Sequence, residues 1–208
     1  MRIIENENNK DVMRKIIVLI LILFLLVCQN SEAGLFAFHP QNNLDNADYL
    51  MRIDRPLAAD KLINDVINFC KKKNDETCLA TAYFYYGKLL MGRQGETDKW
   101  YKISSYVDRG ITTDNVNQKS MEYFEKALAL AKKHELNDII SAIYIKIGIL
   151  KFTDFKDRAS ACGSFDQSLH YNLIFQKNNP DQKVILTKGF NSFEEYILEG
   201  KKEMGCPK

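Results

Sequence analysis

The stretch YFYYG, from Tyr83 to Gly87, places four aromatic side chains in a row directly before the smallest residue. It lies in a segment with helical spacing of apolar residues, and successive side chains on an α-helix point about 100° apart. Four adjacent rings therefore cannot share one face of a helix. A lone surface helix would leave much of this apolar area in water, so we expect this helix to be contacted from several sides by other helices.

Other segments also carry apolar residues at helical spacing. Pro56 suits the first turn of a helix, and the residues that follow it form one stripe: Ala59, Leu62, Ile63, Val66, Ile67 and Cys70. We predict an all-α fold with helices over 46–54, 56–73, 77–92, 97–109, 116–133, 137–153, 156–177 and 192–203. Ser192 and Glu195 have the spacing of a capping box for the last helix. The segment KVILT at 183–187 is ambiguous between helix and strand.

The first residues have the features of an export signal. Arg14 and Lys15 precede an entirely apolar run, IIVLILILFLLV, at 16–27. Twelve residues span about 18 Å as a helix, which is too short for a hydrocarbon core of about 30 Å. Ser31 and Ala33 fit the −3 and −1 positions of a leader-peptidase site, so we predict a signal peptide over residues 1–33.

Two alternatives to simple cleavage stay open. The tetrapeptide ending at Cys28 resembles a bacterial lipoprotein box, which would place the end of the leader at Val27 and a lipid on Cys28. The run could also stay as an uncleaved anchor. Each of these possibilities predicts an exported protein, located in the periplasm or the cell envelope of a bacterium.

Four cysteines lie outside the predicted leader, and an even number in an exported chain favours disulfides. They are Cys70, Cys78, Cys162 and Cys206, and they allow three pairings. Cys70 and Cys78 flank the polar turn between two predicted helices, so this pair could staple a helical hairpin. The other pair would then tie down the C-terminal tail. Buried free thiols are the alternative, and the spacing does not fit a zinc site.

Two sequence elements occur twice. Tyr83-x₃-Gly87 recurs as Tyr144-x₃-Gly148, and SMEYFEKAL at 120–128 recurs as ACGSFDQSL at 161–169. This duplicated pair of elements resembles tetratricopeptide-type repeats, including the Sel1-like variety, over about residues 76–175. The resemblance implies a short α-solenoid of stacked antiparallel helix pairs over 56–208, closed by a C-terminal capping helix. Residues 34–55 would form a linker and a short helix.

The resemblance also implies a concave face that binds a partner. Its positions in this chain are Thr81, Phe84, Lys88 and Met91 in the first copy and Ala142, Ile145, Ile149 and Phe152 in the second. This face is apolar apart from one cation, which suits an amphipathic helix or an extended apolar peptide. The alternative is that these side chains are ordinary core. Gly87 and Gly148 would let a neighbouring backbone approach closely.

Charge and motifs argue against several functions. The net charge is only +2 and no basic stripe is present, which argues against nucleic-acid binding. Hydrolase, zinc-peptidase, phosphate-binding and dinucleotide-binding motifs are absent from the sequence. We therefore expect a protein that is not an enzyme, holds no cofactor or metal, and binds a protein partner as an exported scaffold or adaptor. Secretion and toxin–immunity systems use such proteins; the alternative is a structural lipoprotein anchored at Cys28.

Overall fold

The computed structural model describes residues 38–91, 107–182 and 189–207, and over these residues the regular structure is helical, without strands. The helices are α2 (Pro40–Arg52), α3 (Pro56–Lys73), α4 (Glu76–Leu90), α6 (Val116–Lys133), α7 (Asn137–Thr153), α8 (Arg158–Asn178) and α9 (Phe193–Glu203). All of them belong to the compact unit Pro40–Lys208. The predicted signal peptide, Cys28 and the ambiguous segment 183–187 lie outside the described residues.

Two predicted helices differ from the observed ones. The first was expected over 46–54 but begins at Pro40, because Leu44 and Ala47 are buried against the helices that follow. The helix expected over 97–109 lies mostly outside the described residues. Its last part, 107–109, forms a bend and a turn rather than a helix.

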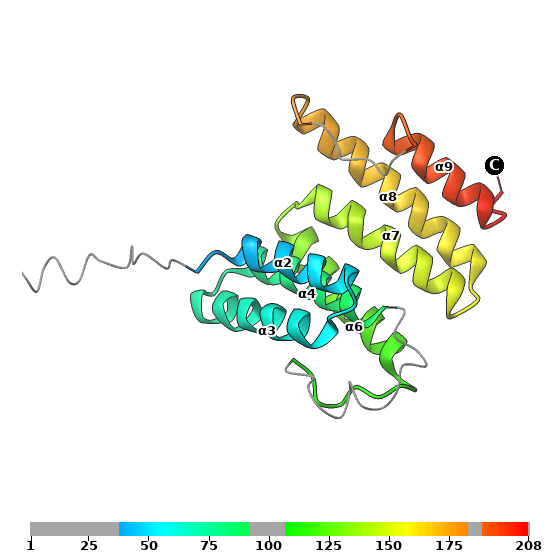
Figure 1. Cartoon of the computed structure of the whole chain (residues 1–208). Helices are drawn as coiled ribbons and strands as arrows, with labels where there is room; N and C mark the ends of the chain where they lie inside the picture. The colour runs from blue at the N-terminus through cyan, green and yellow to red at the C-terminus, as the bar shows by residue number, and fades with distance from the viewer. Residues whose placement is uncertain (1–37, 92–106, 183–188, 208) are drawn as a thin grey trace, which may run out of the picture. The chain divides into compact units, whose positions relative to one another are not determined.

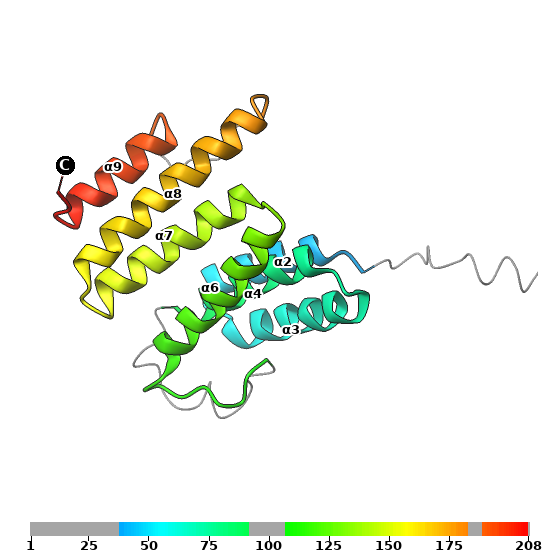
Figure 2. The same ribbon diagram turned by 180° about the vertical axis from the view of Figure 1, so that it is seen from behind.

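The helices form antiparallel pairs that stack in chain order (Figures 1 and 2). We call α2, α4 and α7 the first helices of the pairs and α3, α6 and α8 the second helices. Each second helix packs against its own first helix and against the helix that follows it, and the successive first helices α2, α4 and α7 also contact one another. With α9 packed on α8 as a cap, this is the predicted all-α stack of helix pairs.

In two of the helix pairs, a phenylalanine ring of the second helix packs directly against a glycine of the first helix. A Cβ atom added to Gly87 would lie 2.6 Å from the ring of Phe124, and one added to Gly148 would lie 2.6 Å from the ring of Phe165. The close approach predicted at these glycines is therefore made mainly by an aromatic ring. The same Phe165 ring also lies 2.9 Å from the Cβ position of Gly200, so it contacts the capping helix too.

The four rings of YFYYG are shared between two layers of the stack. Tyr86 is completely buried in the cluster formed by α2, α3, α4 and the first turns of α6. Phe84 belongs to the next cluster, formed by α4, α6 and α7, while Tyr83 and Tyr85 touch both clusters. The expectation that this helix is contacted on several sides is confirmed.

Local signals set the turns and the helix ends. Asn74 and Glu135 adopt left-handed backbone conformations at the ends of α3 and α6, with φ of 53° and 54°. Asp75 then caps α4 by accepting a hydrogen bond from the Cys78 N–H at 2.9 Å. At α9 the Glu195 N–H donates to Ser192 Oγ at 3.0 Å, but the Glu195 carboxylate accepts from Asn191 instead of returning the bond to Ser192.

Both predicted disulfides are formed. Cys70 pairs with Cys78 across the turn between α3 and α4, and Cys162 in α8 pairs with Cys206 beyond the end of α9, each with a Cα–Cα distance of 5.7 Å. The first staples a hairpin of neighbouring helices. The second fastens the tail of the capping helix to the body of the stack.

The contact between ring and glycine generates a first prediction. Gly87→Ala should lower the free energy of unfolding by about 1–2 kcal/mol, because overpacking against the buried Phe124 ring outweighs the gain in helix propensity. The matched control is Gly163→Ala in α8, where the added Cβ meets nothing within 4 Å. This control should raise stability by about 0.5–1 kcal/mol. Urea denaturation measures both, and equal effects of the two variants would contradict this packing.

The disulfides generate a second prediction. The Cys162–Cys206 bridge closes a loop with a sequence separation of 44, and the Cys70–Cys78 bridge one of 8. By loop entropy, replacing the first pair with serines should cost about 4 kcal/mol and replacing the second about 2.5 kcal/mol. Urea denaturation of the two double variants gives this order. Intact mass after alkylation without reductant should show both pairs protected in the exported protein, and reactive thiols there would contradict the pairing.

Candidate protein-binding face

The structure does not gather the eight predicted concave-face residues into one groove. Phe84 and Ile145 are buried, with exposed fractions of 7% and 9%. These two side chains therefore belong to the core, which was the alternative to a binding face. The other six are partly exposed: Thr81, Lys88, Met91, Ala142, Ile149 and Phe152. Ile149 and Phe152 line a slot beside α7, whereas Thr81 and Phe84 line a separate hollow.

Lys88, expected as the single cation of this face, has partners within the fold. Its Nζ atom lies 2.5 Å from Asp48 Oδ1 of α2 and 4.8 Å from the centre of the Tyr85 ring. This ion pair connects two successive first helices. The pair is only partly exposed, and the Lys88 ammonium group also lies over the rings of Phe84 and Tyr85, which adds cation–π attraction.

A second lysine lies beside this pair, and the sequence pattern did not indicate it as a candidate surface residue. Lys146 of α7 is partly buried, and the loss of hydration together with the positive charge of Lys88 lowers its pKa, while Asp48 acts in the opposite direction. Among the described residues, no carboxylate forms an ion pair with Lys146. Asp48 also pairs with Arg52 Nε at 3.7 Å, so Lys146 is a third cation near this carboxylate on the side of the stack formed by the first helices.

The slot lies between α7 and α9. The first helices α2, α4 and α7 contact one another in turn, but the described residues of α7 and α9 make no close backbone contact. The space left has a volume of about 240 Å³, and its floor includes Phe165 of α8. Its lining residues are Ile149, Phe152, Phe165, Phe190, Tyr196, Glu199, Gly200, Glu203 and Met204.

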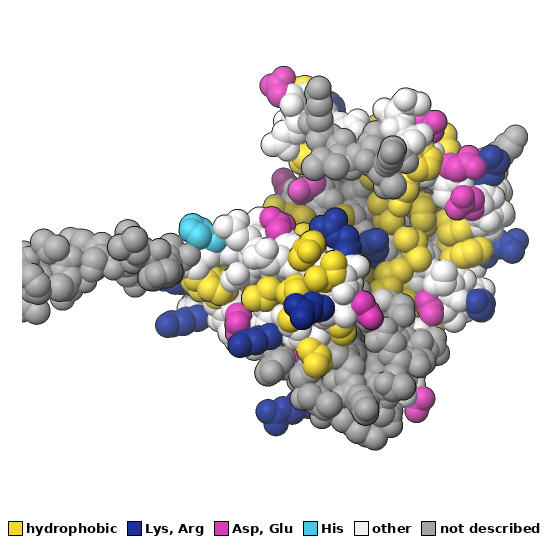
Figure 3. All heavy atoms as spheres, in the orientation of Figure 1, with side chains coloured by type: hydrophobic (Ala, Val, Ile, Leu, Met, Phe, Trp, Pro, Cys, Tyr) yellow, Lys and Arg dark blue, Asp and Glu magenta, His cyan; other side chains and the backbone are white. Residues whose placement is uncertain are grey.

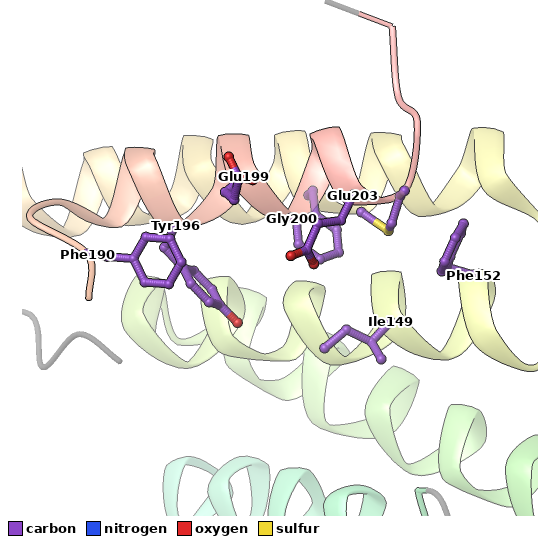
Figure 4. A pocket seen from close by; sticks show the side chains of 9 residues that line it. Ile149, Phe152, Phe190, Tyr196, Glu199, Gly200 and Glu203 are labelled. Atoms are coloured by element: carbon purple, nitrogen blue, oxygen red, sulfur yellow. The ribbon is translucent and has the colours of Figure 1, made fainter. Parts of the chain in front are cut away.

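Figure 4 shows how the lining side chains are oriented. Ile149 and Phe152 rise from α7, Tyr196 reaches down from α9, and the Glu203 carboxylate points into the gap. Glu199 is held by Lys202, with Oε1 at 2.9 Å from Nζ, whereas no described cation pairs with Glu203. The slot is therefore apolar inside and carries an acidic group on its α9 edge.

The basic and apolar parts of this surface are neighbours. Lys146 and Ile149 are three residues apart on one helix, so their side chains lie side by side. Figure 3 shows Lys and Arg side chains near the centre of this face, with a hydrophobic area beside them. The surface therefore changes from basic at α4 and α7 to apolar in the slot and to acidic at α9.

The second hollow is wider and more polar. It opens among the N-terminal ends of α2, α4 and α7, with a volume of about 690 Å³. Asp75 and Asp138 line it together with Thr81 and Phe84. The hydrogen bonds that Asp75 accepts from the Cys78 N–H and the Thr77 hydroxyl lower its pKa, so this carboxylate is occupied with capping α4.

The described part of the chain has neither a metal-binding cluster nor a membrane-spanning helix. No group of three or more His, Cys, Asp or Glu side chains there is arranged to hold a metal ion. None of the helices in that part combines the length and the apolar character needed to cross a membrane.

Comparison with known proteins gave no match: no protein-family model, curated protein or solved structure is significantly similar to this chain.

The position of Lys146 generates a third prediction. Lys146→Met should raise the free energy of unfolding by about 1 kcal/mol, because the variant removes a partly buried cation next to Lys88 and keeps the aliphatic volume. Since the pKa of Lys146 is lower in the folded chain than in the unfolded chain, the stability of the wild type should rise with pH above the folded pKa. That rise should be smaller in the variant.

The control for this prediction is Lys61→Met, at an exposed position of α3. We expect it to change stability by less than about 0.5 kcal/mol. Urea denaturation between neutral and alkaline pH measures both variants. A lower free energy of unfolding in Lys146→Met would contradict this prediction, because it would show that the cation stabilises the fold.

Proposed function

We propose that this protein is an exported, non-enzymatic scaffold or adaptor that binds a periplasmic or envelope protein through the side of the stack formed by its first helices. The observation that carries the proposal is the surface at Lys88, Lys146 and the slot beside Ile149. It combines partly exposed apolar side chains with Lys146, a cation whose neighbouring carboxylate, Asp48, already pairs with Lys88 and Arg52. Such a combination lowers the stability of the folded chain and favours the binding of a partner protein.

The architecture supports a binding role. Stacked helix pairs extend a surface built from side chains of successive repeats, and such surfaces are commonly used to hold other proteins. The duplicated ring-on-glycine contact supports the resemblance to tetratricopeptide-type repeats that the sequence suggested. On this resemblance, α4 with α6 and α7 with α8 are the two repeats.

The two disulfides support the location. Disulfides of this kind suit an oxidising compartment outside the cytosol. Together with the apolar run at 16–27, they favour export to the periplasm or the cell envelope. A partner there could belong to a secretion system, or be a toxin that this chain neutralises.

Site-specific photocrosslinking tests the proposal. Benzoylphenylalanine would replace Ala142 or Ile149 on α7, or, as matched controls, the exposed Glu125 or Gln167 on the second helices. In the native cells, irradiation should link the full chain to a partner protein from the α7 positions and not from the controls. Adducts formed only from the second helices would place the binding surface elsewhere, and adducts from neither would contradict a protein-binding role.

A further inference from the structure

We infer that the slot between α7 and α9 holds an amphipathic helix of the partner, oriented by charge. Large apolar side chains of this helix enter the slot, an acidic edge faces Lys146 and Lys88, and a basic edge faces Glu203. This inference rests on the proposed function and gives it a partner of defined chemistry.

The size of the slot limits what can enter. An apolar cavity of about 150 Å³ is large enough to hold a benzene molecule. The slot has about 240 Å³ and is lined mainly by aromatic and aliphatic side chains, so it takes one aromatic side chain or two smaller apolar ones. It is too small to enclose a whole helix, which must therefore lie along its mouth.

The packing of the stack favours a helix over an extended segment. The face that each first helix turns toward the next one is covered by another helix at α2 and at α4. At α7 the corresponding neighbour would be α9. The side chains of Ile145 and Ile197 share a buried cluster, but the two described backbones make no close contact and leave a gap lined by Ile149 and Phe152. A partner helix over this gap would continue an arrangement that the stack already uses twice.

The charges on the two sides of the slot define the orientation. On the α7 side, the carboxylate of Asp48 already pairs with Lys88 and Arg52, and Lys146 adds a further positive charge beside them. The positive charges there exceed the negative charge of Asp48. On the α9 side, Glu203 points into the gap, and no cation among the described residues pairs with it. A helix with one acidic and one basic edge satisfies both sides, and the reversed helix places like charges together.

A peptide selection tests this inference on the purified, disulfide-bonded chain. The probe is a phage-displayed library of helical peptides of about 16 residues, or roughly four turns. Their apolar positions repeat at i, i+3, i+4 and i+7, and the two flanking edges are randomised among Glu, Lys and Gln. Selected peptides should carry Glu on one edge and Lys on the other. Absence of binders, or edges without a charge preference, would overturn the inference.

Variants then locate the bound peptide. Fluorescence anisotropy should show binding about fivefold to tenfold weaker for Lys146→Met and for Ile149→Ala. Lys61→Met and Leu173→Ala are the matched controls, since both positions are exposed and lie on α3 and α8. Lys146→Met is expected to remain folded, so its affinity shows whether the peptide binds at the slot even if Ile149→Ala is destabilised. Equal affinities for all variants would place the peptide outside the slot.

A proline in the middle of the selected peptide tests the helix itself. Proline breaks a helix but is tolerated in an extended segment, so binding should be lost. Retained binding would overturn the helical assignment. The selection uses no physiological partner, and its failure is therefore distinct from that of the proposed function, which the crosslinks from α7 decide.

Discussion

The packing of a phenylalanine ring against a helical glycine sets the geometry of this stack. A glycine inside a helix is less favourable than alanine by about 1 kcal/mol, yet Gly87 and Gly148 occupy the same position in two helices. In each case the ring fills the volume of the missing Cβ atom, which allows the two helices of a pair to approach closely. Because both pairs use the same contact, they have the same internal arrangement and can stack in series.

The same interaction explains the slot. The far side of the Phe165 ring meets Gly200, and the Cys162–Cys206 bridge holds the following tail on α8. The capping helix α9 thus packs its backbone against α8, while its Ile197 side chain shares a buried cluster with Ile145 of α7. On this side of α7, Ile145 is buried in the cluster shared with α8 and α9, whereas Ile149 and Phe152 pack at its edge and line the slot.

Much of the fold could be predicted from the sequence because the signals are local. Helical spacing placed α3, α6 and α7 within a residue or two of their observed ends, and the position of Cys70 and Cys78 across a short turn indicated their pairing. The start of α2 was missed, since its two buried residues, Leu44 and Ala47, form too short a stripe. Lys146 was missed because nothing in its neighbourhood along the chain indicates the proximity of Lys88.

The sequence by itself determined the class of fold and the duplicated pair of elements, and it favoured the observed cysteine pairs over the other pairings, because each of these depends on spacing along the chain. Only the tertiary structure decided which of the eight expected surface residues face solvent, and that Phe84 and Ile145 are core. It alone brought Asp48, Lys88 and Lys146 from three helices to one place and set α9 apart from α7. These are distances between segments far apart in the chain, and they follow from how rings, glycines and a disulfide pack in space.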